Sequence, residues 1–188
     1  MQILTKEEFD IEKNSILEKI RNGSIFIHPT DTIYGIGCNA LSSELVSKVR
    51  EIKGRPDQPF SVIAPSKEWI YEKCIVIEEA NEWIEKLPGP LTLILKLKEN
   101  CVAQEVSPGL DTIGIRMPDH WFKDVVAELG FPVITTSTNR KGENFMTSID
   151  DLDSRIKGKI DFVIYEGEKK GKPSKIIHLE GKLKIIER

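Results

Sequence analysis

The chain has 188 residues, 39% of them hydrophobic and 30% charged, and 27 basic against 30 acidic side chains leave a net charge of −3. This composition is ordinary for a globular protein with one buried core, so we expect a single domain over residues 1–188. The acidic balance argues against tight, sequence-independent binding of nucleic acid, which needs a surplus of Lys and Arg.

The first residues and the cysteines indicate a cytoplasmic protein. No apolar run approaches the roughly 20 residues of a membrane span. The N-terminus becomes acidic and helical by Glu8, which is too early for a signal peptide. Cys38, Cys74 and Cys101 are odd in number and form no CxxC pair, so we expect reduced thiols rather than disulfides or a zinc site.

In the first half of the chain, helical patterns alternate with short apolar runs. Thr5-Lys6-Glu7-Glu8 is a capping-box pattern and predicts a helix that ends at Gly23. Ser42 is expected to cap a second helix, after a loop at Gly35 and Gly37. The strands predicted in this half cover 24–28 and 60–64.

The second half continues the alternation after a helical middle that Pro88-Gly89-Pro90 ends. Asp119 is predicted to cap a helix that ends at Gly130, and Ser148 to open a short helix. Strands are predicted over 91–97, 112–117, 132–136 and 161–165, and a closing hairpin over 176–179 and 183–186. We therefore expect an α/β (α+β) fold, in which helices pack on one twisted sheet of mixed and antiparallel strands.

Polar stretches at the ends of these elements carry the functional signal. Hydroxyls, an amide and two cations at such places are typical of a site for a small anionic ligand. No phosphate-loop, dinucleotide-binding or hydrolase-elbow motif is present. The stretches are Thr30-Asp31-Thr32, Lys53-Gly54-Arg55, Ser137-Thr138-Asn139 and Pro173-Ser174-Lys175.

Lys53 and Arg55 are the candidate phosphate ligands. In an extended segment, residues two apart point the same way, and a guanidinium fork beside an ammonium suits a polyphosphate. The alternative is a solvated basic helix end, which is favourable to the helix dipole.

Each of the other polar stretches has a structural alternative. The hydroxyls near Thr32 and Ser137 either bind a ligand or satisfy the turns that contain them. The basic stretch 169–175 is either a solvated loop or a flap over phosphates. His28, His120 and His178 lack the spacing of metal ligands, and we expect structural roles for them.

The order of the motifs is more specific than any one of them. From about Ile25 to the last residue, the chain resembles the short form of the YrdC-type threonylcarbamoyl-AMP synthases. The segments that carry the resemblance are 29–37, Lys53-Gly54-Arg55-Pro56, Pro88-Gly89-Pro90-Leu91-Thr92, Gly114-Ile115-Arg116-Met117-Pro118, Ser137-Thr138-Asn139 and Pro173-Ser174.

This resemblance implies a nucleotidyltransferase with a concave ligand cleft. Its substrates would be ATP, L-threonine and bicarbonate, with Mg²⁺ bound to the ATP rather than in a protein cage. Its product would pass to the transferase that makes threonylcarbamoyladenosine in tRNA. Carried over by motif, the threonine-binding residues are Thr32, Arg116, Ser137 and Ser174. The nucleotide-binding residues are Lys53, Arg55, Thr112, Asn139, Thr147 and Arg188, of which Lys53 and Arg55 are the catalytic pair.

The chain departs from the family pattern at three places, one of which is Pro173-Ser174-Lys175 in place of the common Glu-Ser-Thr. Ile63 stands where many relatives have a histidine, and Arg188 is the last residue, without the glycine that usually follows it. Two other functions are kept open. One is a non-catalytic RNA-binding module, since the fold of the family resembles that of proteins linked to structured RNA. The other is a paralogue that acts on a different carbamoyl nucleotide.

Overall fold

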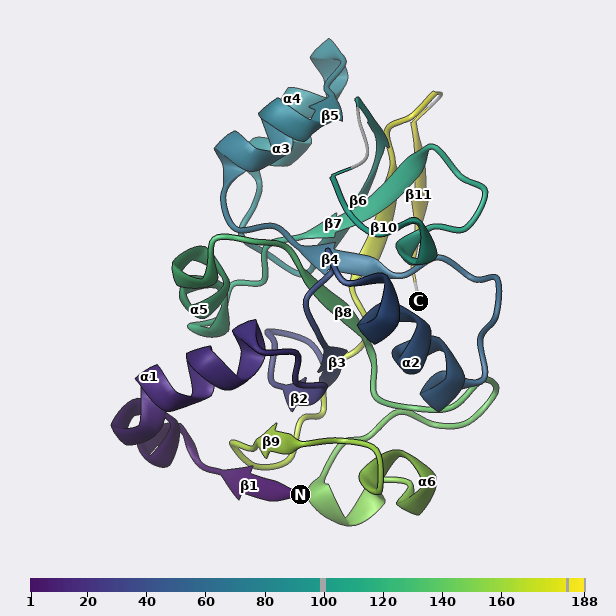
Figure 1. The fold of residues 1–188 in the computed structure, drawn as a ribbon. Helices are drawn as coiled ribbons and strands as arrows, with labels where there is room; N and C mark the ends of the chain where they lie inside the picture. The colour runs from purple at the N-terminus through teal and green to yellow at the C-terminus, as the bar shows by residue number, and fades with distance from the viewer. Residues whose placement is uncertain (99–100, 182, 188) are drawn as a thin grey trace.

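The computed structural model describes residues 1–98, 101–181 and 183–187 (Figure 1). Its helices are α1 Lys6–Arg21, α2 Ser43–Lys53, α3 Lys67–Lys73, α4 Glu78–Glu85, α5 Phe122–Leu129 and α6 Ser154–Lys157, with 3-10 turns η1 Gln104–Val106 and η2 Ile149–Asp151. Its strands are β1 Gln2–Leu4, β2 Phe26–His28, β3 Gly35–Gly37, β4 Ser61–Ile63, β5 Cys74–Ile75, β6 Leu91–Leu97, β7 Thr112–Arg116, β8 Val133–Ser137, β9 Phe162–Ile164, β10 Lys175–His178 and β11 Lys184–Ile186.

The described strands form one mixed sheet. The order is β1-β9-β2-β3-β8-β4-β7-β6-β10-β11, with β5 paired to β6 off this path. Strands β1/β9, β2/β9, β4/β7 and β6/β10 pair in parallel, and the other neighbours are antiparallel. The predicted fold class, a mixed sheet with packed helices, is confirmed. No helix of the described residues has the length and apolarity needed to cross a membrane.

Helix ends follow local side-chain chemistry where a cap is present. Thr5 and Glu8 form the predicted capping box at the start of α1, and the Ser42 hydroxyl accepts from the Leu45 amide at the start of α2. The prediction that Asp119 caps the next helix is wrong. Helix α5 begins at Phe122 without a side-chain cap, and the amide of Asp119 instead donates to the Asp31 carboxylate over 3.0 Å.

Three strands are not among those predicted from the sequence: β1, β3, and β5, which interrupts the expected helical middle. β1 pairs with β9, about 160 residues further along the chain. β3 was expected to be a loop, but it pairs with both β2 and β8. Gly35 and Gly37 of β3 lack side chains, which lets the rings of Phe26 and His28 on β2 pack closely against their backbone. A Cβ atom on Gly37 would lie 2.8 Å from the Phe26 ring, and one on Gly35 would lie 3.0 Å from His28 Nε2.

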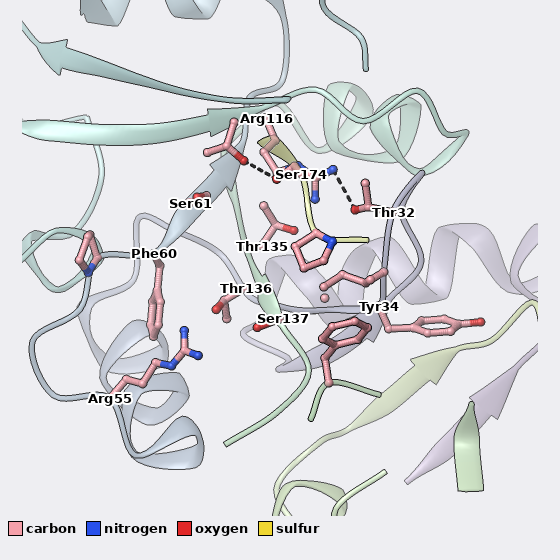
Figure 2. A pocket seen from close by; sticks show the side chains of 16 residues that line it. Thr32, Tyr34, Arg55, Phe60, Ser61, Arg116, Thr135, Thr136, Ser137 and Ser174 are labelled. Carbon is pink, nitrogen blue, oxygen red and sulfur yellow. Dashed lines mark hydrogen bonds between the residues drawn. The ribbon is translucent and has the colours of Figure 1, made fainter. Parts of the chain in front are cut away.

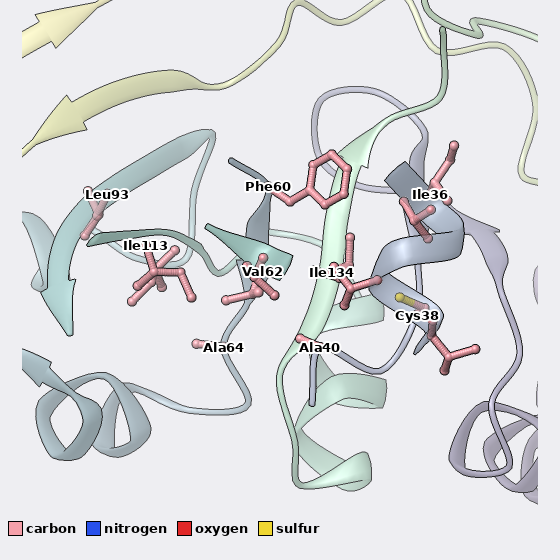
Figure 3. Packing of buried hydrophobic residues seen from close by; sticks show 14 of the residues in the cluster. Ile36, Cys38, Ala40, Phe60, Val62, Ala64, Leu93, Ile113 and Ile134 are labelled. Atoms are coloured by element: carbon pink, nitrogen blue, oxygen red, sulfur yellow. The ribbon is translucent and has the colours of Figure 1, made fainter. Parts of the chain in front are cut away.

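The strands separate two cores because consecutive residues point to opposite faces of the sheet. On one face, α2 covers Ile36, Val62 and Ile134 (Figure 3). On the other face, α1 and α5 cover residues next to these, among them Ile63 and Val133. Helices α1 and α5 lie together on the opposite side of the sheet from α2 (Figure 1). They cover only part of their face, and the rest carries small polar residues.

Candidate active site

A cavity of about 130 Å³ opens on the face that α1 and α5 share (Figure 2). Ser61 and Thr135 form part of its floor, and they alternate along β4 and β8 with apolar residues of the other face. Residues from distant parts of the sequence meet there. Of the predicted site residues, five line the cavity: Thr32, Arg55, Arg116, Ser137 and Ser174.

One end of the cavity is built around Arg116. Its guanidinium donates to Asp31 over 2.7 Å and to the Thr32 hydroxyl over 3.2 Å, and both members of the ion pair are nearly buried. Thr30 serves the turn itself, since its hydroxyl donates to the Ile33 carbonyl and accepts from the Thr32 amide. The turn therefore presents Thr32 and a fixed cation to the cavity. A guanidinium held in this way suits a ligand carboxylate.

The basic stretch 169–175 crosses this turn. Gly171 packs so closely on Thr32 that a Cβ atom there would lie 2.1 Å from the Thr32 carbonyl oxygen. Next to it, Pro173 and Ser174 line the cavity, and the Ser174 hydroxyl is 2.7 Å from that of Thr92. The stretch thus forms one wall of the site.

Lys53 and Arg55 diverge, which corrects the expectation that both point the same way. Gly54 adopts the left-handed conformation (φ 61°) and ends α2, so the segment is not extended. Arg55 reaches the cavity wall, whereas Lys53 is fully buried and is not among the lining residues. Burial, and after it the charge of Arg55, lowers the pKa of Lys53 from 10.5 to about 7.

The Lys53 ammonium joins α2 to the segment after β8. It donates to the carbonyl oxygens of Ser137 and Asn139, at 2.9 Å for Asn139, and lies 3.3 Å from Asn139 Oδ1. Asn139 Oδ1 also accepts from the Ser137 hydroxyl over 2.6 Å, and its Nδ2 donates to the Glu143 carbonyl. Lys53, Ser137 and Asn139 therefore meet, and Ser137 is the member of this group that faces the cavity.

Besides Lys53, three predicted nucleotide ligands do not line the cavity. Asn139 is engaged as above, and the Thr147 hydroxyl bonds to Asp151. Thr112 begins β7 and shares a face with Arg116, about 13 Å away along the strand. Arg188 lies outside the described residues. Ile63, at the family's histidine position, is fully buried in the core under α1 and α5.

The hydroxyls of the cavity floor are not among the residues predicted from the sequence. Ser61, Thr135 and Thr136 lie within strands and line the cavity, together with the aromatic rings of Tyr34 and Phe60. The available signal was a Ser or Thr in an otherwise apolar strand, such as Ser61 before Val62 and Ile63. That signal becomes informative only when the neighbouring strands are known.

The histidines do not gather into a metal site. The described residues contain no group of three or more His, Cys, Asp or Glu side chains that could hold a metal ion. His28 is buried, stacks on Phe122 at 4.5 Å and leaves Nε2 without a hydrogen-bond partner. Burial lowers its pKa from 6.5 to about 3, so it is neutral at neutral pH.

Comparison with known proteins shows to which family the chain belongs. Residues 18–188 match the Sua5/YciO/YrdC family, which is described as "Telomere recombination". A Methanocaldococcus jannaschii protein, provisionally named threonylcarbamoyl-AMP synthase, is 40% identical over 183 residues, which cover 90% of this chain and 83% of that protein. The threonylcarbamoyl-AMP synthase of Pyrococcus abyssi is 37% identical over 165 residues, which cover 85% of this chain but 48% of the relative.

Solved structures give the same result. The structure of P. abyssi Sua5 complexed with L-threonine has a TM-score of 0.86 and 32% identity, and it covers 99% of this chain and 56% of that one. Escherichia coli YciO also has a TM-score of 0.86, covering 100% of this chain and 94% of that one, and at 22% identity it shows the fold alone. The chain spans about half the length of the P. abyssi relative. With the ordered motifs and the fold, these matches show that the chain belongs to the Sua5/YciO/YrdC family.

Proposed function

We propose that this protein makes threonylcarbamoyl-AMP and pyrophosphate from L-threonine, bicarbonate and ATP. The observation that carries the proposal is that five predicted site residues line one cavity. They are Thr32, Arg55, Arg116, Ser137 and Ser174. Relatives named for this activity, one of them solved with L-threonine, support it.

Each of the two guanidiniums that line the cavity, those of Arg55 and Arg116, would bind a different anionic group. Arg116, oriented by Asp31, would bind the carboxylate of L-threonine, and the nearby hydroxyls would bind its remaining polar groups. Arg55 would bind the phosphates of ATP. Lys53 would act by holding Ser137 and Asn139, since its ammonium is already bonded to their carbonyls.

The chemistry would proceed in two steps. The threonine amine attacks bicarbonate, and loss of water leaves a carbamate. A carbamate oxygen then attacks the α-phosphorus of ATP, and the bond to pyrophosphate breaks. Both steps bring anions together, so fixed cations in a small cavity would supply most of the acceleration by positioning and charge stabilisation. This agrees with a lining in which hydroxyls and guanidiniums, rather than carboxylates, carry the charge and polarity.

Mg²⁺ would arrive with the nucleotide. Asp31, the carboxylate beside the cavity, is already paired with Arg116 and bonded to the Asp119 amide. The described residues therefore do not offer a carboxylate cage, and the ion would be held by phosphate oxygens and water.

We further propose that the adenylate passes to the transferase that modifies tRNA, and that the protein works in the cytoplasm.

Mass spectrometry of the reaction products tests the proposal. With Mg²⁺, we expect threonylcarbamoyl-AMP and pyrophosphate only when ATP, L-threonine and bicarbonate are all present. Arg55→Ala should lower kcat/KM for ATP by about 100-fold or more. Arg155→Ala is the matched control, since Arg155 is exposed and pairs with Asp153 and Glu143.

The two alternative functions give different results. A module that only binds RNA would show salt-sensitive tRNA binding and no turnover. A paralogue would release pyrophosphate with another carbamoyl acceptor and not with L-threonine. Either result would overturn the proposal.

A further inference from the structure

The guanidinium of Arg50 is buried between α2 and the segment that follows it. Nη1 lies within hydrogen-bond distance of the Arg55, Pro56 and Gln58 carbonyl oxygens, at 2.9, 3.0 and 3.0 Å. Residues 54–60 belong to no helix or strand, so these carbonyls are not paired in a regular element and take a side-chain donor instead. Arg50 therefore satisfies the backbone of the segment that carries Arg55 into the cavity.

The same guanidinium reaches a second segment. Nε donates to the Glu105 carbonyl over 2.6 Å, and Nη2 donates to the Val106 carbonyl over 3.3 Å. The Val106 carbonyl also accepts from the Phe60 amide over 2.8 Å. Arg50 thus ties residues 55–58 to the 3-10 turn η1, on which the start of β4 is also fixed.

Two further contacts hold the wall of the cavity on Arg50. Its guanidinium lies 4.5 Å from the centre of the Phe60 ring, and Phe60 lines the cavity beside Arg55. The Arg50 carbonyl accepts from the Arg55 amide over 3.1 Å at the end of α2. Arg55 is therefore held through both its amide and its carbonyl by one residue.

We propose that Arg50 is a positioning residue that places Arg55 and Phe60 in the cavity wall. The inference rests on the proposed function, in which Arg55 binds ATP. Lysine cannot replace Arg50, because an ammonium is a single donor centre, whereas the planar guanidinium reaches two segments at once. Arg50 does not itself line the cavity, so it acts through its neighbours.

Steady-state kinetics of Arg50→Lys and Arg50→Met test the proposal. A displaced Arg55 should raise KM for ATP by about tenfold or more, and KM for L-threonine should stay within about twofold, because Arg116 and Ser174 are untouched. A merely structural role would lower the thermal midpoint and the amount of active enzyme and leave both KM values unchanged. Arg21→Met is the matched control, since Arg21 also donates to a backbone carbonyl, that of Glu128, and is exposed.

A double-mutant cycle shows whether Arg50 acts through Arg55. In an Arg55→Ala background, Arg50→Lys should add little further increase in KM for ATP. Fully additive effects, or a folded Arg50→Met protein with the wild-type KM for ATP, would overturn the proposal.

Hydrogen exchange of the wild-type protein tests the proposal even where the variants do not fold. The amides of Arg55 and Phe60 should exchange as slowly as those in the interior of α2. Exchange at the rate of an exposed loop would refute the proposal that Arg50 holds these residues in place. If wild-type protein makes no product but shows this protection, the proposed function fails and the positioning of Arg55 stands.

Discussion

The two faces of the sheet are built from the same strands but do different work. On the α2 face, neighbouring strands present large apolar residues such as Val62 and Ile134, and the helix closes over them. On the other face, apolar residues such as Ile63 and Val133 lie under α1 and α5. Further along the same strands, Ser61 and Thr135 replace them, and the face opens into the cavity.

This comparison shows how the protein makes a polar site without weakening its core. Two residues along a strand are about 7 Å apart and share a face, so Ile63 and Ser61 can serve different purposes on β4. The apolar face supplies burial, which stabilises in proportion to area. The polar half of the other face can then keep its hydroxyls and guanidiniums for a ligand.

Breaking the buried ion pair between Arg116 and Asp31 should have the largest effect on stability of all the changes near the cavity. The Arg116 and Asp31 side chains are 7% and 9% exposed, so Arg116→Met leaves a carboxylate buried without its cation. We expect a loss of about 3–5 kcal/mol in the free energy of unfolding, measured in urea. The double variant Arg116→Met/Asp31→Asn should lose less than the sum of the single variants. A loss under about 1 kcal/mol for Arg116→Met would show that the pair is not needed there.

Adjacent residues of β8 test the difference between the faces directly. Ile134 is fully buried against α2, and Ile134→Ala should cost about 3 kcal/mol of unfolding free energy. Thr135→Val keeps the shape but removes a hydroxyl that faces the cavity, so stability should change by less than about 1 kcal/mol while product formation falls. Equal losses of stability in the two variants would contradict this division.

The acid stability of the protein should depend on His28. The unfolded state takes up a proton on this residue below pH 6.5, whereas the folded state does so only near pH 3. The contribution of neutral His28 is therefore complete above pH 6.5 and is lost progressively as the pH falls toward 3. Between pH 7.5 and 4.5, the unfolding free energy of the wild type should fall by roughly 2–3 kcal/mol more than that of His28→Phe. At pH 7.5, where His28 is neutral in both states, the difference in unfolding free energy between the two proteins reports the change in packing alone. If the unfolding free energies of the two proteins change in parallel with pH, His28 does not determine the acid stability.

The smallest effect is expected at the start of α1, far from the cavity. Thr5→Ala removes the hydroxyl that accepts from the Glu8 amide over 3.2 Å. The unfolding free energy should fall by about 1 kcal/mol, and the kinetic constants for ATP and L-threonine should not change. A change in either KM would mean that α1 affects the polar half of its face.

The sequence by itself determined the local features of this protein. The capping box at Thr5, the cap at Ser42 and most strands depend on neighbours in the chain, so their patterns are readable. Five of the site residues predicted from the ordered motifs also line the cavity. At Asp119, however, the local pattern predicts a helix cap, whereas in the structure the Asp119 amide bonds to the carboxylate of Asp31, which is distant in sequence.

Only the tertiary structure decided which polar groups face the ligand and which support it. Lys53 and Arg55 share a motif, yet the left-handed turn at Gly54 sends Arg55 to the cavity and buries Lys53 against the segment after β8. The floor hydroxyls and the role of Arg50 likewise depend on strands and loops that are distant in sequence. Contacts of this kind are set by how the faces pack, which a local pattern does not encode.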